Sequence, residues 1–478
     1  WSSNNVSTNG FKKMYTEYRV NSVYATADFG FKNQLFLNLT GRNDWFSTLD
    51  PDNNHYFYPS ATLSWVFTDT FDAPDWFTFG KIRGAYASAS NGTTAYQNML
   101  AYKILDWKMN GHDLATVNNS NFPNEELKPV RITEYEVGLN LSFLDNRLSF
   151  DAAYYNKNTK DDIAWVTTSN ASGFTSAIKN VGEIQNQGFE LLVNFVPVST
   201  QDFRWNSTFN ISYNDSEVKY LGEVNGEPVK SLSIDGASSR SGGVSIQNIV
   251  GKPYGEIVGL GYKRYNGQIV FDEKGLPVAE TEVRSLGNGV YKVNGGWHNE
   301  FTYKNFTLSF LIDFKAGADL FSGSNYSFYG EGLHKETLKG RESNYTVSGY
   351  RETANGFEPV SITIVPSGAD ASKNQVNAQD YYSEIASRNI AEEFIYNASF
   401  IKLRELSFGY TFPQSMLGKQ KAIKGLSISL VGRNLWTILK HTDNIDPESA
   451  YNNSNGQGLE LNGYPAQRSV GFNVNIKF

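Results

Sequence analysis

Few residues of this sequence are spaced for catalysis. The histidines occur singly, and no HExxH pattern marks a zinc-protease centre; they are His55, His112, His298, His334 and His441. No GxSxG elbow and no GxxxxGK(S/T) loop occurs, and the lack of cysteine excludes thiol catalysis and cysteine-ligated zinc. Adjacent carboxylates such as Asp161 and Asp162 are more typical of solvated loops than of glycosidase acid–base pairs. We therefore expect no enzyme and no cofactor.

Two segments carry clusters of hard oxygen ligands that Ca²⁺ prefers. One spans residues 50–54, and the other supplies the candidates Asp443, Asp446 and Glu448. Such residues are also frequent in Asx-rich turns. We favour the turn interpretation and expect no metal site.

Three tryptophans are candidates for ligand contact. Trp107, Trp165 and Trp297 lie in or beside long segments that follow predicted strands. Indole rings there could stack on sugar faces or peptide side chains. The competing interpretation places them in an aromatic girdle or in packing between loops.

Composition excludes several classes of protein. The 478 residues carry 42 Lys and Arg against 49 Asp and Glu, without a basic stripe, so we expect no nucleic-acid partner. Aromatic residues make up 14% of the chain although its mean hydropathy is −0.43, which is not the composition of a disordered chain. No run approaches the ~18 apolar residues that a membrane-spanning helix needs.

Alternation of apolar and polar residues is the strongest pattern and has the period of a β-strand. Within 201–215 the apolar positions are Phe203, Trp205, Phe209, Ile211 and Tyr213, with polar residues at every even position from 202 to 214. Such runs reach about 10–15 residues, whereas usual strands have about 5–6. This length suits tilted membrane-crossing strands of about 9–11 residues or more. The alternative is a half-buried strand of a soluble sandwich, which is normally shorter.

The pattern predicts an all-β, antiparallel transmembrane barrel fold. Thirteen strands are expected, at 17–31, 33–43, 57–68, 78–90, 132–144, 147–158, 184–196, 201–215, 296–304, 305–315, 398–412, 424–435 and 467–478. Short connections alternate with long ones at 44–56, 91–131, 159–183, 216–295, 316–397 and 436–466. Short turns on one side and long loops on the other are typical of outer-membrane barrels. The C-terminus then lies on the periplasmic side, and the long loops are extracellular.

Two local features refine this prediction. In 398–412 the parity of Leu406 and Phe408 differs from that of Ile401 and Leu403, which predicts a β-bulge near Arg404 and Glu405. The alternative is that Lys402 and Arg404 snorkel at the outer interface. Phe478, which ends an alternating strand, matches the C-terminal signal that barrel-assembly machinery reads.

Several motifs resemble those of SusC-like (SusC/RagA) TonB-dependent outer-membrane transporters. The segment 399–413, SFIKLRELSFGYTFP, is similar to the signature near the C-terminus of that family. The segments VGRNLWT (431–437), DPE (446–448) and YP (464–465) follow in the expected order. Upstream, LTGRNDW (39–45), YPS (58–60) and NVGEIQNQGFE (180–190) match as well.

The resemblance implies a plugged barrel of 22 strands, a size whose lumen side chains alone cannot fill. Residues 1–478 would be its C-terminal portion. An odd count cannot close such a barrel, so at least one strand is missing, and the resemblance implies about nine. The plug and the segment that engages TonB would also lie outside this chain, which opens at Trp1 as though inside a longer polypeptide.

The resemblance also implies a function and partners. Members pair with a SusD-like surface lipoprotein that acts as a lid, and a dimer of transporter–lipoprotein pairs is one assembly that it allows. They import oligosaccharides or oligopeptides through TonB while embedded in outer-membrane lipid. We expect loops 216–295 and 316–397 to form the interface with the lid, since loops of this length are rarely idle. The alternatives are a passive porin or surface adhesin barrel, and a secreted β-rich carbohydrate-binding protein.

Overall fold

The structure is a computed structural model that describes residues 15–117, 121–167, 171, 173–174, 176–224, 226–235, 242–417, 423–450 and 456–478. The expectation about the start of the chain at Trp1 lies outside these residues. The chain divides into two compact units. The first comprises 1–64, 84–135 and 157–183, and the second comprises 65–83, 136–156 and 184–478.

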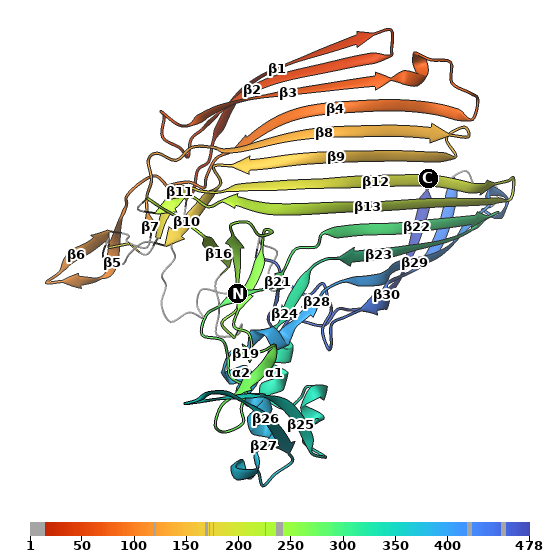
Figure 1. Ribbon diagram of the computed structural model, residues 1–478. Helices are drawn as coiled ribbons and strands as arrows, with labels where there is room; N and C mark the ends of the chain where they lie inside the picture. The colour runs from red at the N-terminus through yellow and green to blue at the C-terminus, as the bar shows by residue number, and fades with distance from the viewer. Residues whose placement is uncertain are drawn as a thin grey trace. The chain divides into compact units, whose positions relative to one another are not determined.

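All thirteen predicted strands are confirmed. They belong to one sheet whose order follows the chain (Figure 1). Their bounds are β1 (Val20–Phe31), β2 (Leu35–Phe46), β3 (His55–Val66), β4 (Phe77–Asn91), β8 (Val130–Phe143), β9 (Leu148–Lys160), β12 (Glu183–Ser199), β13 (Phe203–Tyr220), β22 (Val293–Tyr303), β23 (Phe306–Ala316), β29 (Phe400–Phe412), β30 (Gly425–Lys440) and β32 (Ser469–Lys477). Several continue further toward the long loops than predicted. At the end of β13, for example, the odd positions that were mostly apolar up to Tyr213 become charged, at Asp215, Glu217 and Lys219, so the alternation on which the prediction relied is lost there.

Side chains of the second unit separate into an apolar and a polar face. One row of directly paired residues runs across six strands and is apolar throughout: Trp205, Phe301, Leu308, Phe408, Leu430 and Phe472. The next row is polar or glycine throughout: Arg204, Thr302, Thr307, Gly409, Ser429 and Asn473. Phe203, Trp205, Phe209 and Ile211 belong to none of the buried cores of the described residues. The apolar face is therefore not the inside of a dry core.

Short connections join alternate pairs of sheet strands. Three residues, 32–34, connect β1 to β2. Lys32 and Asn33 have φ of 51° and 55°, and the Gln34 N–H donates to the Phe31 carbonyl at 2.9 Å. Two consecutive left-handed residues are what a type I′ hairpin turn requires, and its twist matches that of the strands. The other short connections include Lys304 at φ 53° and the 3-10 turns η2 (Phe67–Asp69) and η7 (Gln414–Met416).

Long connections of the first unit carry small sheets. They contain β5 (Tyr102–Met109), β6 (His112–Val117), β7 (Asn121–Phe122), β10 (Ile163–Thr167) and β11 (Ser176–Asn180). The strands β5 and β6 form a separate hairpin, whereas β10, β11 and β7 form a three-stranded sheet. A small core of Phe46, Leu49, Leu127 and Ile178 holds parts of this unit together.

The two longest connections, 221–292 and 317–399, fold together in the second unit and are called the loop module here. The first supplies β14 (Glu223–Val224), β15 (Glu227–Pro228), β16 (Ser231–Asp235), β17 (Ser245–Ile249), β18 (Glu256–Gly259), β19 (Arg264–Tyr265), β20 (Gln268–Phe271) and β21 (Arg284–Asn288). The second supplies β24 (Asp319–Ser322), α1 (Gly323–Gly330), η4 (Lys335–Leu338), β25 (Tyr345–Thr353), β26 (Gly356–Val365), η5 (Ala371–Lys373), β27 (Gln375–Asn377), α2 (Ala378–Ser387), η6 (Ala391–Phe394) and β28 (Ile395–Asn397).

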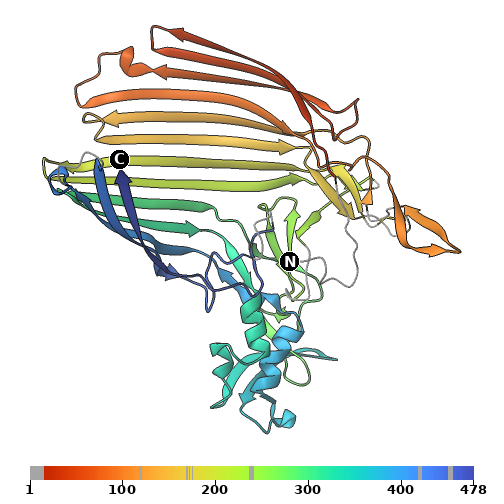
Figure 2. The ribbon, with the colours of Figure 1, turned by 180° about the vertical axis from the view of Figure 1, so that it is seen from behind.

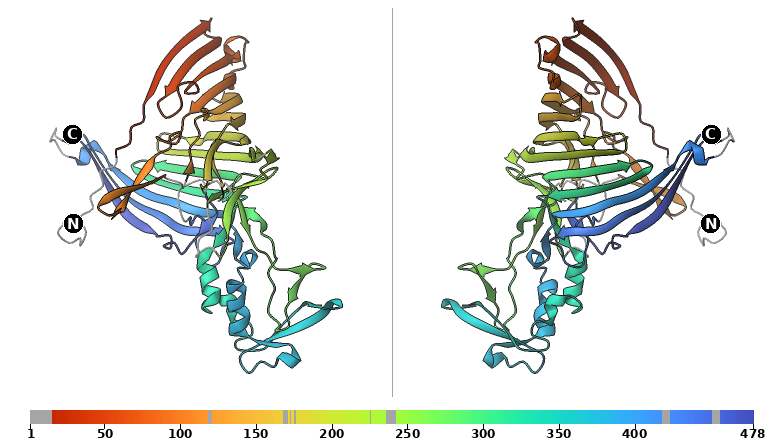
Figure 3. Two further views of the ribbon diagram at one scale, coloured as in Figure 1. Left: turned by 90° about the vertical axis from the view of Figure 1, so that its left-hand side faces the viewer. Right: turned by 90° about the vertical axis from the view of Figure 1, so that its right-hand side faces the viewer.

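The loop module has a hydrophobic core of its own. Phe271 from the first connection and Phe321, Ile362 and Phe394 from the second are fully buried in it. The helices α1 and α2 lie side by side next to the β25–β26 hairpin (Figures 2 and 3). The described residues of both long loops thus form folded structure with a core. No helix in the described part of the chain is long and apolar enough to cross a membrane.

The predicted bulge in β29 is confirmed at Arg404. Leu311 of β23 pairs with Glu405 and the next residue, Ile312, pairs with Leu403, so that Arg404 is the extra residue. The register toward β30 shifts at the same place. The inserted residue lets Leu403 and Leu406 both take places in the apolar pairing although they are three positions apart.

A charge placed on the apolar face tests whether that face meets lipid. We expect Phe209→Arg to destabilise the membrane-inserted protein by about 2 kcal/mol or more, because an arginine in mid-strand would face hydrocarbon. The neighbour Asn210 points to the other face, so Asn210→Arg should be close to neutral. The measurement is urea unfolding of the protein in lipid vesicles, read by heat-modifiable migration on a gel. Equal effects of the two variants would contradict a lipid-facing side.

Candidate functional site

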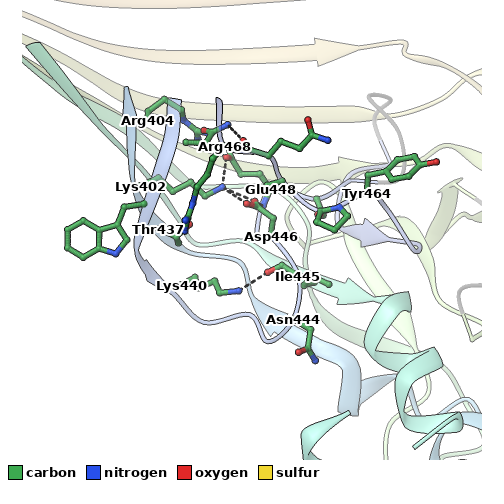
Figure 4. Close-up of a pocket in the computed structure, with 16 residues that line it drawn as sticks. Lys402, Arg404, Thr437, Lys440, Asn444, Ile445, Asp446, Glu448, Tyr464 and Arg468 are labelled. Atoms are coloured by element: carbon green, nitrogen blue, oxygen red, sulfur yellow. Dashed lines mark hydrogen bonds and ion pairs between the residues drawn. The ribbon is translucent and has the colours of Figure 1, made fainter. Parts of the chain in front are cut away.

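A cavity of about 460 Å³ lies on the second unit between the strands β29 and β30 and the last long connection, 441–468. Its wall carries Lys402, Arg404 and Asn434. The connection lines it with Asn444–Asp446, Glu448, Ser449 and Tyr464–Arg468 (Figure 4). A volume of this size is within the range of ligand pockets in proteins.

The two cations of the wall lie at and just before the bulge in β29. Lys402 pairs in register with Asp313 of β23, which places it on the polar side of the sheet. Arg404, the extra residue, turns its guanidinium to the same side and donates through Nε to Asp313 at 2.8 Å and through Nη1 to Asn434 at 3.0 Å. The snorkelling alternative is therefore wrong. Lys402 is only 4% exposed, and both cations face carboxylates rather than the outer interface.

Carboxylates of the last long connection complete an ion-pair network with this wall. The ammonium of Lys402 contacts both oxygens of Asp446, at 2.7 and 3.0 Å, and Glu448 at 2.8 Å (Figure 4). Glu448 also binds Arg404 at 2.7 Å and Lys315 at 3.2 Å. The amide N–H of Glu448 donates to Asp446 at 2.8 Å, which fixes the two carboxylates relative to each other.

The network determines the charge state of Glu448. Burial by itself raises the pKa of this carboxyl group, but the hydrogen bonds and charges of Lys402 and Arg404 outweigh burial and lower the pKa to about 2. Glu448 is therefore ionised throughout the physiological range of pH, and each wall cation keeps its counter-charge.

The same connection is also fixed to the loop module. Glu460 of β31 (Leu459–Glu460) is 1% exposed, and its carboxylate accepts from the Ser322 hydroxyl at 3.0 Å and from the Ser324 hydroxyl at 2.7 Å. Asn325 donates to the carbonyl of Asp443 at 3.1 Å and accepts from Asn444 at 2.9 Å. The connection 441–468 thus binds the strand wall on one side and the loop module on the other.

The candidate calcium ligands Asp443, Asp446 and Glu448 take part in ion pairs and hydrogen bonds with other protein groups. Asp446 and Glu448 meet in space, but lysine and arginine occupy the positions around their oxygens. Asp443 takes part through its backbone carbonyl. The described residues contain no group of three or more potential metal ligands of the His, Asp and Glu types.

The candidate tryptophans lie in separate elements. Trp107 is in β5 and Trp165 in β10, where it pairs with Ile178 of β11. Trp297 in β22 pairs with Phe209 on the apolar face, and its indole donates to the Ser207 hydroxyl at 2.9 Å. Trp297 therefore lies within a strand of the large sheet rather than in a long connection. Phe478 follows β32 at the end of the sheet and is exposed.

Two residues of the cavity escaped the sequence analysis. Lys440 ends β30 and Arg468 directly precedes β32, and both line the cavity. Neither belongs to a motif, and only the pairing of distant segments brings them beside Lys402. The sequence carries one signal for this region: the segments VGRNLWT, DPE and YP follow one another in the order that is typical of the family they resemble.

Comparisons with known proteins match this chain to TonB-dependent receptors. The family model described as "TonB dependent receptor-like, beta-barrel" matches residues 2–435. TonB-dependent receptor P3 of Formosa agariphila is 25% identical over 495 residues, which cover 96% of this chain and 45% of that protein. TonB-dependent receptor SusC of Bacteroides thetaiotaomicron is 24% identical over 486 residues, covering 96% and 43%. The chain spans about half the length of the curated relatives it matches.

Solved structures show the same fold. The RagAB peptide transporter superimposes with a TM-score of 0.77 at 18% identity, over 100% of this chain and 50% of the matched chain. The "open-open" state of the RagAB peptide importer gives 0.74 at 19% identity, over 100% and 49%. At this identity the likeness concerns the fold, and it agrees with the prediction from alternation.

The network offers a test of its contribution to stability. Lys402→Gln should lower the free energy of unfolding by about 3 kcal/mol or more, because it leaves two carboxylates with fewer counter-charges in a buried place. Arg433→Gln is the matched control. The Arg433 side chain is 66% exposed and forms an ion pair with Glu405, so its loss should cost less than about 1 kcal/mol. Urea unfolding measures both. Similar small losses would show that the network contributes no more than a surface pair.

Proposed function

Because this chain belongs to the TonB-dependent receptor-like β-barrel family, we propose that it forms the C-terminal part of an outer-membrane importer of oligosaccharides or oligopeptides. The protein performs no chemistry on its cargo and works with energy delivered through TonB. The motifs that engage TonB, and the plug that closes the lumen, belong to the part of the protein outside this chain.

The separation of the two strand faces carries this proposal. Paired rows of apolar residues, from Trp205 to Phe472, suit lipid, and the neighbouring polar rows suit a wet lumen. Strands such as β12 and β13, with 17 and 18 residues, are long enough to cross the membrane with a tilt. The polar face also carries the ion-pair network, which a lipid-facing surface would not tolerate.

The strands at the ends of the sheet support a larger barrel. β1 pairs with β2 alone and β32 with β30 alone, so each of them has one edge without a partner in the described sheet. Unpaired backbone groups are costly in hydrocarbon, and membrane barrels therefore close. We propose that further strands of the same protein pair with both edges and complete a barrel of about 22 strands.

Loop lengths give the orientation in this proposal. The long connections, with the loop module and the cavity beside it, lie on the extracellular side, and the C-terminus at Phe478 lies on the periplasmic side, where it serves as the assembly signal. A SusD-like lipoprotein docks on the loop module as a lid. Trp107 and Trp165, on long connections of the first unit, are proposed to contact cargo. Pairs of transporter and lipoprotein assemble as a dimer.

A passive porin or adhesin is the competing function, and import by the cell separates it from the proposal. We expect growth on the cargo, and uptake of a labelled form of it, to stop when the gene for this protein or the gene for TonB is deleted. Uptake should return when the full-length protein is restored from a plasmid. Uptake that continues without TonB would contradict active import and favour a porin.

Docking of the lid can be measured separately. A photo-cross-linking amino acid in place of Leu333, which is 72% exposed in the loop module, should capture the lipoprotein in intact cells. The same substitution at Phe71, which is 61% exposed in the short connection between β3 and β4, should not, because that turn is assigned to the periplasm. Capture at Phe71 alone would reverse the proposed orientation.

A further inference from the structure

We propose that the cavity between β30 and the connection 441–468 binds a carboxylate of the imported ligand through Lys440 and Arg468. This inference rests on the import function proposed above and names a chemical feature of the cargo. It concerns side chains that the ion-pair network leaves unused.

Charges around the cavity do not balance. Four cationic side chains line it, and two carboxylates face them: Lys402, Arg404, Lys440 and Arg468 against Asp446 and Glu448. Both carboxylates are already bound by Lys402 and Arg404. The cavity therefore keeps an excess of two positive charges, on Lys440 and Arg468, at neutral pH.

These two cations have donors to spare. Lys440 donates one hydrogen bond, to the carbonyl of Ile445 at 3.0 Å (Figure 4), and forms no ion pair with any residue that the structure describes. Arg468 has neither a hydrogen bond nor an ion pair within the same described ranges. Its planar guanidinium presents five donors in a fork that matches a carboxylate. A ligand that fits these groups must bring acceptors and negative charge.

Polar groups beside the two cations also suit a ligand that carries a carboxylate. The side-chain amide of Gln467 also lacks a partner within the described part of the chain, and Tyr464 stands at the rim with 97% of its surface exposed. The adjoining network shows that this wall already binds carboxylates, since Lys402 takes up Asp446 at 2.7 Å. The cavity volume of about 460 Å³ suits one end or one acidic unit of an oligomer rather than a whole chain.

Calorimetry on the full-length protein in detergent tests the proposal with two pairs of probes. The first pair is tetragalacturonate and its methyl ester, and the second is tetraglutamate and tetraglutamine with amidated C-termini. We expect the acidic member of one pair to bind about tenfold more tightly than its neutral partner, with the advantage lost in 1 M salt. The pair that shows the difference tells whether the cargo is a uronate glycan or an acidic peptide.

Variants assign the effect to the two cations. Arg468→Gln and Lys440→Gln should each weaken binding of the acidic probe about three- to tenfold and leave the neutral probe unchanged. Arg433→Gln, which removes an exposed cation that does not line the cavity, should change neither. Heat-modifiable migration of each variant shows whether the barrel is intact.

Either of two results would overturn the proposal. One is equal affinity of the wild-type protein for the acidic and neutral members of both pairs. The other is an equal loss for acidic and neutral probes in the Arg468 and Lys440 variants, which would show a structural role. Binding is measured without TonB, so acid-selective binding together with TonB-independent uptake would refute the import mechanism alone.

Discussion

The separation of an apolar face from a polar face along every long strand is the constraint on which the rest of this structure depends. A strand between lipid and water cannot change its register by one residue without exchanging the two faces. The pairing from Trp205 across to Phe472 keeps the faces apart over six strands. Where the sequence interrupts alternation in β29, an extra residue at Arg404 restores it. The bulge thus serves the lipid face and at the same time shapes the polar one.

The ion-pair network lies directly beside this bulge. Arg404 follows Lys402 by two positions, so strand alternation keeps both side chains on the polar face, and the bulge then returns Leu406 to the apolar face. The buried ammonium of Lys402 is tolerated since three carboxylate oxygens surround it within 3.0 Å. These contacts hold a long connection against the wall, and within the residues that the structure describes they leave Lys440 and Arg468 without an ion pair.

The strands could be predicted from the sequence because their signal is local. Alternation with a period of two appears within ten residues, and it located all thirteen strands and the bulge. The network could not be predicted in this way, because Lys402 and Asp446 are 44 positions apart in the sequence and belong to elements of different kind. The fold of the loop module could not be predicted from the sequence either. Its core joins Phe271 to Phe394, and neither surrounding segment has a long regular pattern.

The core of the loop module is built from segments that are far apart in the sequence, and this affects how the chain folds. Its core needs residues from before β22, such as Ile257, residues from after β23, such as Ile362, and also Leu459 and Leu461 from the last long connection. Pairing of β22 with β23 brings the first two segments close together, and the core is complete only with the residues just ahead of β32. Completion of the loop module is consequently coupled to placement of the last strand, so a chain that stops folding before β32 pairs would leave part of this apolar core exposed and prone to aggregation.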